Sequence, residues 1–332
     1  MPLSTPAVKA KARELGFDLC GVAPAVDLPE LAFFHDWLAR GYAGAMGYLE
    51  RSAARRSDVR RVLPSAQTVI VTGTNYNTDR PYSTERADPA SAHIARYAWG
   101  DDYHDVIVGR LEALVDWMRS SSDATFEARV YVDTGPVQER VYARHAGIGW
   151  IGKNTCVINP VLGSWILLGE IICSLPFEVD EPGLDRCGDC SLCIEACPTS
   201  ALVAPGVLDA TRCVSYLTIE SRDAVPETLR EGVGTHVYGC DVCQEVCPWN
   251  AAAKCSDDPA WQPRSVWDGA DVESLSAMSD QALEAALQGS AMRRARLSGL
   301  RRNLEIGLRN SEARRYHRSG RGGASWPPAM VR

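Results

Sequence analysis

The stretch Cys187-Gly-Asp-Cys190-Ser-Leu-Cys193-Ile-Glu-Ala-Cys197-Pro198 decides the fold of the segment that contains it. Two residues between successive cysteines let one tight turn present three thiolates to three corners of a single iron–sulfur cube. The fourth cysteine of such a run ligates a second cube, and the proline after it turns the chain away. The stretch therefore predicts a domain built around two [4Fe–4S] clusters.

A second run, Cys240-x2-Cys243-x3-Cys247-Pro248, has the same spacing but lacks the first cysteine, and Cys213 lies between the two runs. The pattern is that of bacterial ferredoxins. A zinc site, the main alternative, normally uses paired C-x2-C knuckles and fits the four-cysteine run poorly. The predicted ligands are Cys187, Cys190, Cys193 and Cys247 for the first cluster, and Cys197, Cys213, Cys240 and Cys243 for the second.

The composition of the 332-residue chain is that of a globular protein, with 45% hydrophobic and 23% charged residues. No stretch approaches the roughly 18 uncharged apolar residues of a membrane span, so we expect no membrane association. The first residues have neither the basic nor the apolar region of an export signal, and we expect a cytoplasmic location. In that reducing compartment, metal binding explains the twelve cysteines better than disulfides do.

The charge of the chain is unevenly distributed. The net charge of −7 argues against a general nucleic-acid binder, yet residues 293–332 contain eleven arginines and only two glutamates. Such a segment is either a solvated helix face with a disordered end or an arm that binds a polyanion. Charge alone does not decide between the two.

The pattern of apolar residues predicts an α+β protein in three parts. Residues 1–178 are expected to form a mixed α/β domain, with helices over 5–19, 28–40 and 105–119 and short strands over 68–71, 94–97 and 129–132. Residues 179–258 are expected to form the ferredoxin-like domain. Residues 259–332 are expected to form a short helical segment, amphipathic over 271–288 and 292–308, with a disordered tail.

The segment Val130-Tyr-Val-Asp133-Thr134-Gly-Pro136 is typical of a buried strand that runs into a helix. Asp133 falls at the strand end, where active sites of α/β domains tend to lie. In the alternative interpretation, Asp133 or Thr134 caps a helix whose first turn contains Pro136. The later Gly152-Lys-Asn-Thr does not have the form of a phosphate-binding loop.

Several ordered motifs between about residues 10 and 310 resemble the epoxyqueuosine reductase family. They are Asp133-Thr-Gly-Pro-Val-x-Glu-Arg140, Gly147-Ile-Gly-Trp-Ile-Gly-Lys-Asn-Thr155, Tyr48-Leu-Glu-Arg51, Arg56-x-Asp58, Gly100-x-Asp102-Tyr-His104 and Arg301-Arg302-Asn303, together with the cysteines. The resemblance implies a cobalamin- and iron–sulfur-dependent oxidoreductase. Such an enzyme reduces the epoxide of epoxyqueuosine to queuosine at the wobble position of tRNA, the last step of queuosine biosynthesis.

The resemblance also implies a mechanism. Electrons pass from the first cluster to the second and reduce base-off cobalamin to cob(I)alamin, which acts on the epoxide while Asp133 protonates the oxygen. A helix N-terminus would lower the pKa of Asp133, whereas a general acid near neutrality needs a raised pKa. We expect desolvation beneath the corrin to outweigh the helix dipole. His104 lacks the motif of a cobalt-ligating histidine and is expected to be a packed or hydrogen-bonded residue. The expected corrin-binding residues are Arg56, Asp133, Asn154, Ser215 and Asp241.

The expected partners are the anticodon stem-loop of tRNA and an unidentified low-potential electron donor, and we expect a monomer. The residues predicted to bind the RNA are the clustered arginines of the predicted helix 292–308, with Asn303 adding a hydrogen bond to a phosphate or base: Arg293, Arg294, Arg296, Arg301 and Arg302. Longer family members carry HEAT-like repeats after the ferredoxin-like domain, and this chain ends soon after Asn310. Two alternatives stay open: a corrinoid-dependent reductive dehalogenase, and a ferredoxin-type electron carrier with two clusters.

Overall fold

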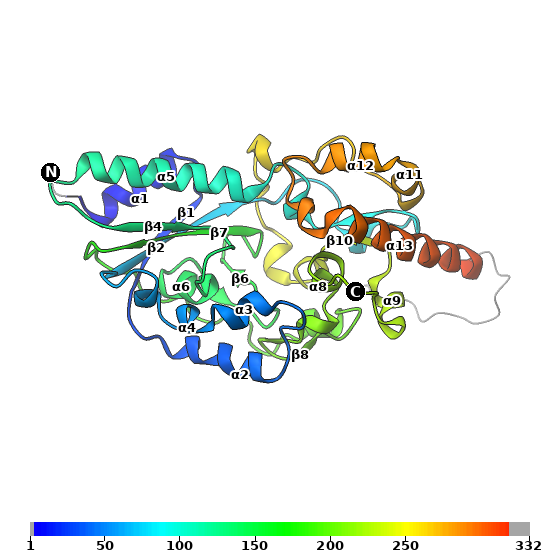
Figure 1. Ribbon diagram of the computed structural model, residues 1–332, viewed down its shortest axis with the longest axis horizontal. Coiled ribbons are helices and arrows are strands. Elements are labelled where there is room, and N and C mark those ends of the chain that lie inside the picture. The colour runs from blue at the N-terminus through cyan, green and yellow to red at the C-terminus, as the bar shows by residue number, and fades with distance from the viewer. Residues whose placement is uncertain (1–2, 319–332) are drawn as a thin grey trace.

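An antiparallel four-stranded sheet forms the centre of the N-terminal half in the computed structural model, which describes residues 3–318 (Figure 1). The strand order is β1-β2-β7-β4, and every neighbouring pair is antiparallel. The central strands β2 and β7 are covered on both faces, so that nearly all of their residues are buried. The strands are β1 (Leu19–Pro24), β2 (Thr68–Asn75), β4 (Ala128–Tyr131) and β7 (Ile166–Cys173).

Helices cover both faces of this sheet (Figure 1). On one face, α1 (Thr5–Glu14) and α5 (Tyr103–Ser121) pack into a core that includes Ile107, Leu111 and Met118. The predicted helix 105–119 is therefore confirmed, whereas α1 ends five residues earlier than predicted. The helices toward the other face are α2 (Phe33–Ala39), α3 (Gly47–Arg51), α4 (Ala53–Arg56) and α6 (Glu139–His145).

The cysteine-rich region is built from short elements. Helices α7 (Leu192–Glu195) and α10 (Val242–Glu245) each lie inside one cysteine run, and they contact each other. Each cysteine run therefore forms the same unit, a turn followed by a short helix. The other elements are the paired strands β8 (Leu202–Ala204) and β9 (Val207–Leu208), and the helices α8 (Val214–Ile219) and α9 (Glu227–Val233).

The C-terminal helices pack on a segment from the N-terminal half. Ala92, Ile94 and Ala98 share one core with apolar residues of the C-terminal helices, and β3 (His93–Ile94) pairs in parallel with β10 (His236–Tyr238). Of the strand predicted over 94–97, only Ile94 lies in a strand, and residues 96–98 form a 3-10 helix instead. The C-terminal helices are α11 (Val272–Ala277), α12 (Asp280–Leu287) and α13 (Arg296–Arg318).

The remaining small sheet pairs β5 (Trp150–Ile151) with β6 (Val157–Ile158). The predicted segment 271–288 forms two helices because Ser279 caps the start of α12 through the N–H of Ala282. Among the described residues, no helix has the length and apolar character needed to cross a bilayer. The predicted disordered tail lies mostly outside the described residues.

Candidate active site and thiol clusters

Asp133 lies on a loop between β4 and α6. Its backbone has a φ of 56°, in the left-handed region that residues other than glycine rarely adopt. Its N–H donates to Glu139 Oε1 at 2.5 Å, and its side chain is 64% exposed. At Gly135 a Cβ atom would lie 2.4 Å from the ring of Tyr131, so this turn has no room for a side chain. Helix α6 begins only at Glu139 and has no side-chain cap, so the interpretation of Asp133 or Thr134 as a helix cap is wrong.

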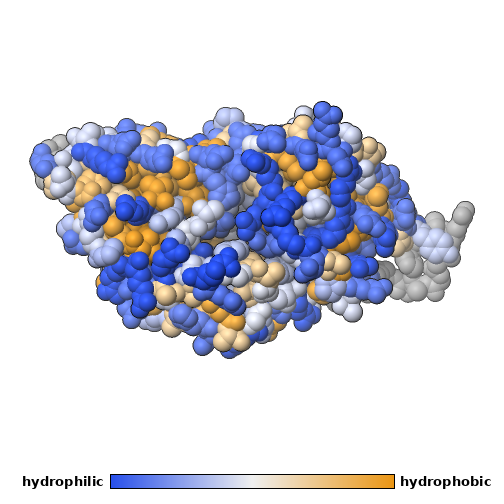
Figure 2. Space-filling model, in the orientation of Figure 1, coloured by the Kyte–Doolittle hydropathy of each residue, from blue (hydrophilic) through white to orange (hydrophobic). Residues whose placement is uncertain are grey.

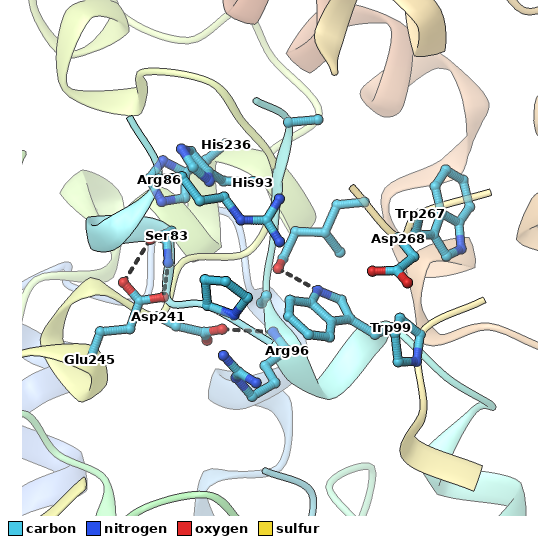
Figure 3. A pocket seen from close by; sticks show the side chains of 15 residues that line it. Ser83, Arg86, His93, Arg96, Trp99, His236, Asp241, Glu245, Trp267 and Asp268 are labelled. Carbon is cyan, nitrogen blue, oxygen red and sulfur yellow. Dashed lines mark hydrogen bonds between the residues drawn. The ribbon is translucent and has the colours of Figure 1, made fainter. Parts of the chain in front are cut away.

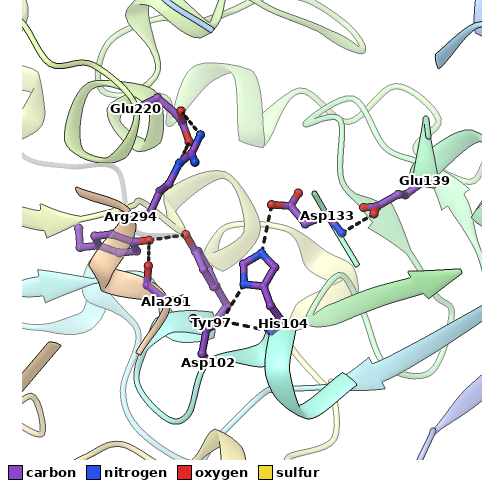
Figure 4. A network of polar contacts seen from close by, with 9 residues as sticks. Tyr97, Asp102, His104, Asp133, Glu139, Glu220, Ala291 and Arg294 are labelled. Atoms are coloured by element: carbon purple, nitrogen blue, oxygen red, sulfur yellow. Dashed lines mark hydrogen bonds and ion pairs between the residues drawn. The ribbon is translucent and has the colours of Figure 1, made fainter. Parts of the chain in front are cut away.

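A histidine lies between two carboxylates beside this loop (Figure 4). His104 Nδ1 is 2.7 Å from Asp102 Oδ1, and His104 Nε2 is 3.6 Å from Asp133 Oδ2. Asp102 also caps α5 by accepting the N–H of His104 at 3.1 Å. The ring of Tyr103 stacks on that of His104, with the centroids 4.0 Å apart. His104 was expected to be a hydrogen-bonded residue, and its position next to Asp133 was not predicted.

The electrostatics of this array favour a proton on the histidine. Burial would lower the pKa of His104, but its bonds to Asp102 and Asp133 raise it to about 9. Desolvation would raise the pKa of Asp133, but the hydrogen bond and charge of His104, with Tyr103 and Arg140, together bring it below its ordinary value. The expected effect of desolvation beneath the corrin on this pKa stays a prediction. At neutral pH, His104 is protonated and Asp133 is ionised.

Arg56 and Arg294 border the loop of Asp133. Arg56 donates from NH1 to the carbonyl of Val137 at 2.9 Å, and burial lowers the pKa of its half-buried guanidinium. The guanidinium of Arg294 lies 5.5 Å from the ring centroid of Tyr48, and it pairs with Glu220 at 2.8 Å. Arg56, predicted from a motif, thus supports the loop that carries Asp133.

The eight predicted cysteines fall into two groups by their electrostatic influence on one another. The pKa of Cys193 is raised to about 11, by burial first and then by Cys247, Cys187 and Cys190. Burial also raises the pKa values of Cys213 and Cys240, and a hydrogen bond with Cys156, followed by burial, raises that of Cys243. The charge of Cys197 affects the pKa of Cys213, and the charge of Cys213 affects the pKa of Cys240. The charges of Cys240 and Cys213 both affect the pKa of Cys243.

Hydrogen-bond donors point at several of these sulfurs. Trp150 Nε1 lies 3.5 Å from Cys187 Sγ, and the N–H of Ala201 lies 3.2 Å from Cys197 Sγ. Within the described residues, no group of three or more His, Cys, Asp or Glu side chains is spaced to hold a single metal ion. Because each thiolate around a cube binds a different iron, cluster ligands lie farther apart than the ligands of one ion. The donor set fits two [4Fe–4S] clusters better than zinc.

Three predicted corrin-binding residues lie around the second thiol group. Asn154 is buried and donates to the carbonyl of Cys243 at 3.1 Å. Ser215 is partly exposed and hydrogen-bonds the thiol of Cys213 through its N–H and its side chain. Asp241 adjoins Cys240 in sequence, but its carboxylate is buried. These residues and the loop of Asp133 thus come from separate parts of the chain.

Asp241 lines a small interior cavity (Figure 3). Its Oδ2 accepts the N–H of Arg96 at 2.6 Å, and burial raises its pKa to about 7. On the same cavity, Glu245 accepts both the N–H and the hydroxyl of Ser83 at 2.7 Å. These bonds tie the second cysteine run to the segment that precedes β3.

Arg140 connects the loop of Asp133 to the second thiol group. Its NH1 donates to the carbonyl of Thr155 at 2.8 Å. Its charge contributes to lowering the pKa values of both Asp133 and Cys156, and the largest lowering effect at Cys156 is a hydrogen bond with Cys243. Arg140 is therefore close enough to act on both the Asp133 carboxylate and Cys156, the neighbour of Cys243.

The predicted RNA-binding role of Arg301, Arg302 and Asn303 is not supported by their positions. Arg301 donates to the carbonyls of Ser276 and Met278, and Arg302 donates to three carbonyls near α8. Asn303 is fully buried. These side chains hold α13 in place, which the charge pattern could not reveal.

Other arginines, one just before α13 and one at its first residue, do face solvent. Arg293 and Arg296 are exposed, and neither forms an ion pair with any described residue. Figure 2 shows strongly hydrophilic residues gathered over the first part of this helix. Arg293 lies close enough to influence the pKa of Asp102, so this positive surface adjoins the array of His104.

Comparisons with known proteins agree with these features. Residues 186–250 match the family model described as a 4Fe-4S double cluster binding domain. Residues 56–134 match the model described as Epoxyqueuosine reductase QueG, DUF1730. The chain thus contains a 4Fe-4S double-cluster domain that coincides with the cysteine runs.

Whole-chain relatives extend the similarity. An epoxyqueuosine reductase of Gloeobacter violaceus is 42% identical over 91% of this chain and 94% of its own length. One of Pseudomonas aeruginosa is 41% identical over 92% of this chain and 84% of its own length.

Two solved structures are also similar. A crystal structure of epoxyqueuosine reductase with an epoxyqueuosine-modified tRNA-Tyr stem loop has a TM-score of 0.84 at 30% identity, and covers 92% of this chain and 81% of the other. A structure from Bacillus subtilis, with its catalytic aspartate loop swung out of the active site, has a TM-score of 0.83 at 29% identity, and covers 92% and 81%.

Proposed function

This chain belongs to the epoxyqueuosine reductase family, and on that premise we propose that it reduces the epoxide of epoxyqueuosine in tRNA to give queuosine. The net reaction consumes two electrons and two protons and releases water. The observation that carries the proposal is the exposed carboxylate of Asp133, which lies 3.6 Å from the ring of a protonated His104. Membership of this family argues against the two alternatives, a corrinoid-dependent reductive dehalogenase and a ferredoxin-type electron carrier.

We propose that the two thiol groups are the cluster ligands assigned from the sequence. When bound, [4Fe–4S] clusters supply single electrons at low potential. Cys190 of the first group is exposed, which leaves that side open to an electron donor. Cys156 hydrogen-bonds Cys243 of the second group and lies close enough to Arg140 for that charge to act on its thiol, and this favours the second group as the side from which electrons leave for the substrate.

We propose that base-off cobalamin binds between Asp133 and the second thiol group. When bound, it supplies a strongly reducing cobalt centre next to the epoxide. Arg56 and Ser215 are partly exposed and would contact the corrin, whereas Asn154 and Asp241 are buried and would hold the backbone behind it. Both ring nitrogens of His104 face carboxylates, so this histidine does not offer a free nitrogen to cobalt.

The protein's own contribution to the chemistry is a proton for the epoxide oxygen. As the C–O bond breaks, negative charge develops on that oxygen, and a positioned acid stabilises it. Asp133 is ionised at rest, so the proton comes from His104 Nε2 and passes through the Asp133 carboxylate. The 3.6 Å separation between His104 and Asp133 must shorten for this transfer, as is common when substrate completes a site.

We propose that the anticodon stem-loop of tRNA binds across the opening beside Asp133, with the modified base turned out of the loop. Readers of single-stranded RNA commonly accept such splayed bases. Arg293 and Arg296 face solvent and can contact phosphates without breaking an ion pair to any described residue, and Arg293 lies close enough to Asp102 to influence its pKa. Of the arginines predicted to bind the RNA, these two remain as proposed contacts, whereas Arg301 and Arg302 bind internal carbonyls.

Complementation in cells tests the function. A bacterial host that lacks its own epoxide-reducing enzyme accumulates epoxyqueuosine in its tRNA. Expression of this chain, with cobalamin supplied, should convert that nucleoside to queuosine in digested tRNA. An unchanged nucleoside profile with well-expressed, cluster-containing protein would contradict the proposal.

A further inference from the structure

Glu170 is a carboxyl group in the interior of the central sheet. It lies on β7, opposite Val71 of β2 and Tyr131 of β4, and it is fully buried. Neither of its carboxyl oxygens has a hydrogen-bond donor among the described residues. Burying an ionised carboxylate without a partner is so unfavourable that such a group takes up a proton instead.

Helix α6, which carries Glu139, packs against β7, which carries Glu170, and the two carboxyl groups lie close enough to share a hydrogen bond. Two ionised carboxylates are both acceptors and cannot bond each other, so this contact requires a proton. Burial, and then the neighbouring Glu139, raise the pKa of Glu170 well above its ordinary value. Burial and the charge of Asp133 raise the pKa of Glu139 to about 7. Near neutrality the pair therefore holds at least one proton, preferentially on Glu170.

Glu139 also holds the backbone of the catalytic loop. Its Oε1 accepts the N–H of Asp133 at 2.5 Å (Figure 4). Asp133 has a left-handed backbone, which an aspartate adopts only when its surroundings compensate for the strain. The bond to Glu139 is a direct contact that stabilises this conformation. Arg140, Arg56 and Tyr103 are the other ionisable groups that influence or are influenced by Glu139.

We propose that Glu170 and Glu139 form a proton-sharing pair that positions the loop of Asp133. Glu170 donates its proton to Glu139, and Glu139 accepts the N–H of Asp133, which directs the Asp133 carboxylate toward His104. Both glutamates are positioning residues, since neither faces the substrate. The proposal deepens the proposed function and rests on the role of Asp133 given there.

Two substitutions of Glu170 test this positioning role in the reconstituted enzyme. Glu170→Gln supplies a fixed N–H donor of the same shape and should keep kcat within about twofold of wild type. Glu170→Met has a similar length but no donor, and should lower kcat about tenfold or more while KM for the stem-loop stays unchanged. In the same variant, the backbone amides of residues 132–136 should exchange with deuterium faster.

A purely structural role for Glu170 predicts a different outcome. Replacing a buried polar group by an apolar one of similar volume is often neutral or stabilising. If Glu170→Met keeps wild-type kcat and wild-type exchange over residues 132–136, the positioning role is wrong. If Glu170→Met does not fold, the activity of Glu170→Gln and the following measurement still decide the proposal.

Infrared spectroscopy tests the shared proton without turnover. The difference spectrum between wild type and Glu170→Gln at pH 7 should contain the carbonyl band of a protonated carboxylic acid, lost in the variant. The absence of this band would overturn the proposal. A fully active Asp133→Asn variant would instead refute the role of Asp133 in proton transfer. The infrared band and the exchange data would then still show whether Glu170 and Glu139 share a proton and position the loop.

Discussion

At the scale of single residues, Asp133 and His104 divide one task between them. A general acid near neutral pH needs a proton, whereas the surroundings of Asp133 hold its carboxylate ionised. His104 carries the proton instead, between Asp102 and Asp133. Because the three groups interact strongly, their titration belongs to the array as a whole.

Replacing Asp133 by asparagine should abolish this transfer. The amide keeps the size of the side chain and the backbone N–H that binds Glu139, but it cannot pass on a proton. We expect kcat to fall about a hundredfold or more, with both clusters and the thermal midpoint retained. Single-turnover assays with iron analysis measure both quantities. Activity near that of wild type would mean that Asp133 only shapes the loop.

The pH dependence of turnover should report His104. Free histidine has a pKa of about 6.5, and in the folded protein the two carboxylates raise the pKa of His104 to about 9. The folded state is stabilised by this proton fully below the unfolded pKa, and loses that stabilisation as the pH rises through about 9. Above that pH His104 has lost the proton that it passes to Asp133, so we expect kcat to decline. His104→Gln should be slower and lack this inflection, and an inflection that survives in the variant would assign it to another group.

At the scale of elements, the turn before α8 carries Cys213, the proposed eighth cluster ligand. Cys213 immediately precedes α8, and the N–H groups of Ser215 and Tyr216 hydrogen-bond its thiol. Backbone donors of this kind stabilise a thiolate, because they favour the charged form. The element is thus shaped to hold a ligand sulfur.

Cys213→Ala should therefore remove the second cluster and spare the first. Iron should fall from about eight to about four atoms per chain, since each cube holds four. Iron and sulfide analysis, with electron paramagnetic resonance of the reduced protein, measures this loss. Cys255→Ala is the matched control, because Cys255 is exposed and belongs to neither thiol group. Full iron content in Cys213→Ala would show that another residue completes the set.

How far the sequence predicts an element depends on how local its determinants are. Helix α5 follows from its own apolar spacing, and the thiol groups follow from cysteine spacing. Helix α6 begins at Glu139 rather than near Pro136, because the intervening turn packs Gly135 against Tyr131. The contact between Glu139 and Glu170 joins α6 to β7, and the pattern of neither segment reveals it.

At the scale of the whole molecule, the site is assembled from all three parts of the chain. The loop of Asp133 comes from the N-terminal half, the second thiol group from the cysteine-rich region, and the exposed arginines from the start of α13. The count of charges correctly located a basic segment, but it could not tell which arginines face solvent and which bind internal groups. Whether an arginine binds internal carbonyls, as Arg302 does, depends on tertiary contacts with α8.

Binding of the stem-loop should depend on salt through the exposed arginines. Arg293→Ala/Arg296→Ala should weaken binding and lower the slope of log affinity against log salt by somewhat under one unit for each lost phosphate contact. Titrations at several salt concentrations measure both changes. Arg309→Ala is the matched control, because Arg309 pairs with Glu305 on α13. An unchanged slope in the double variant would place the RNA elsewhere on the surface.

The reaction itself provides the most direct test of the central claim. Protein reconstituted anaerobically with iron, sulfide and cobalamin is mixed with a low-potential reductant and a stem-loop that contains epoxyqueuosine. The nucleosides are then digested and analysed by mass spectrometry. We predict that the substrate nucleoside loses one oxygen atom and becomes queuosine, only when cobalamin and reductant are both present. Intact epoxyqueuosine in the presence of both, with the clusters fully assembled, would contradict the account.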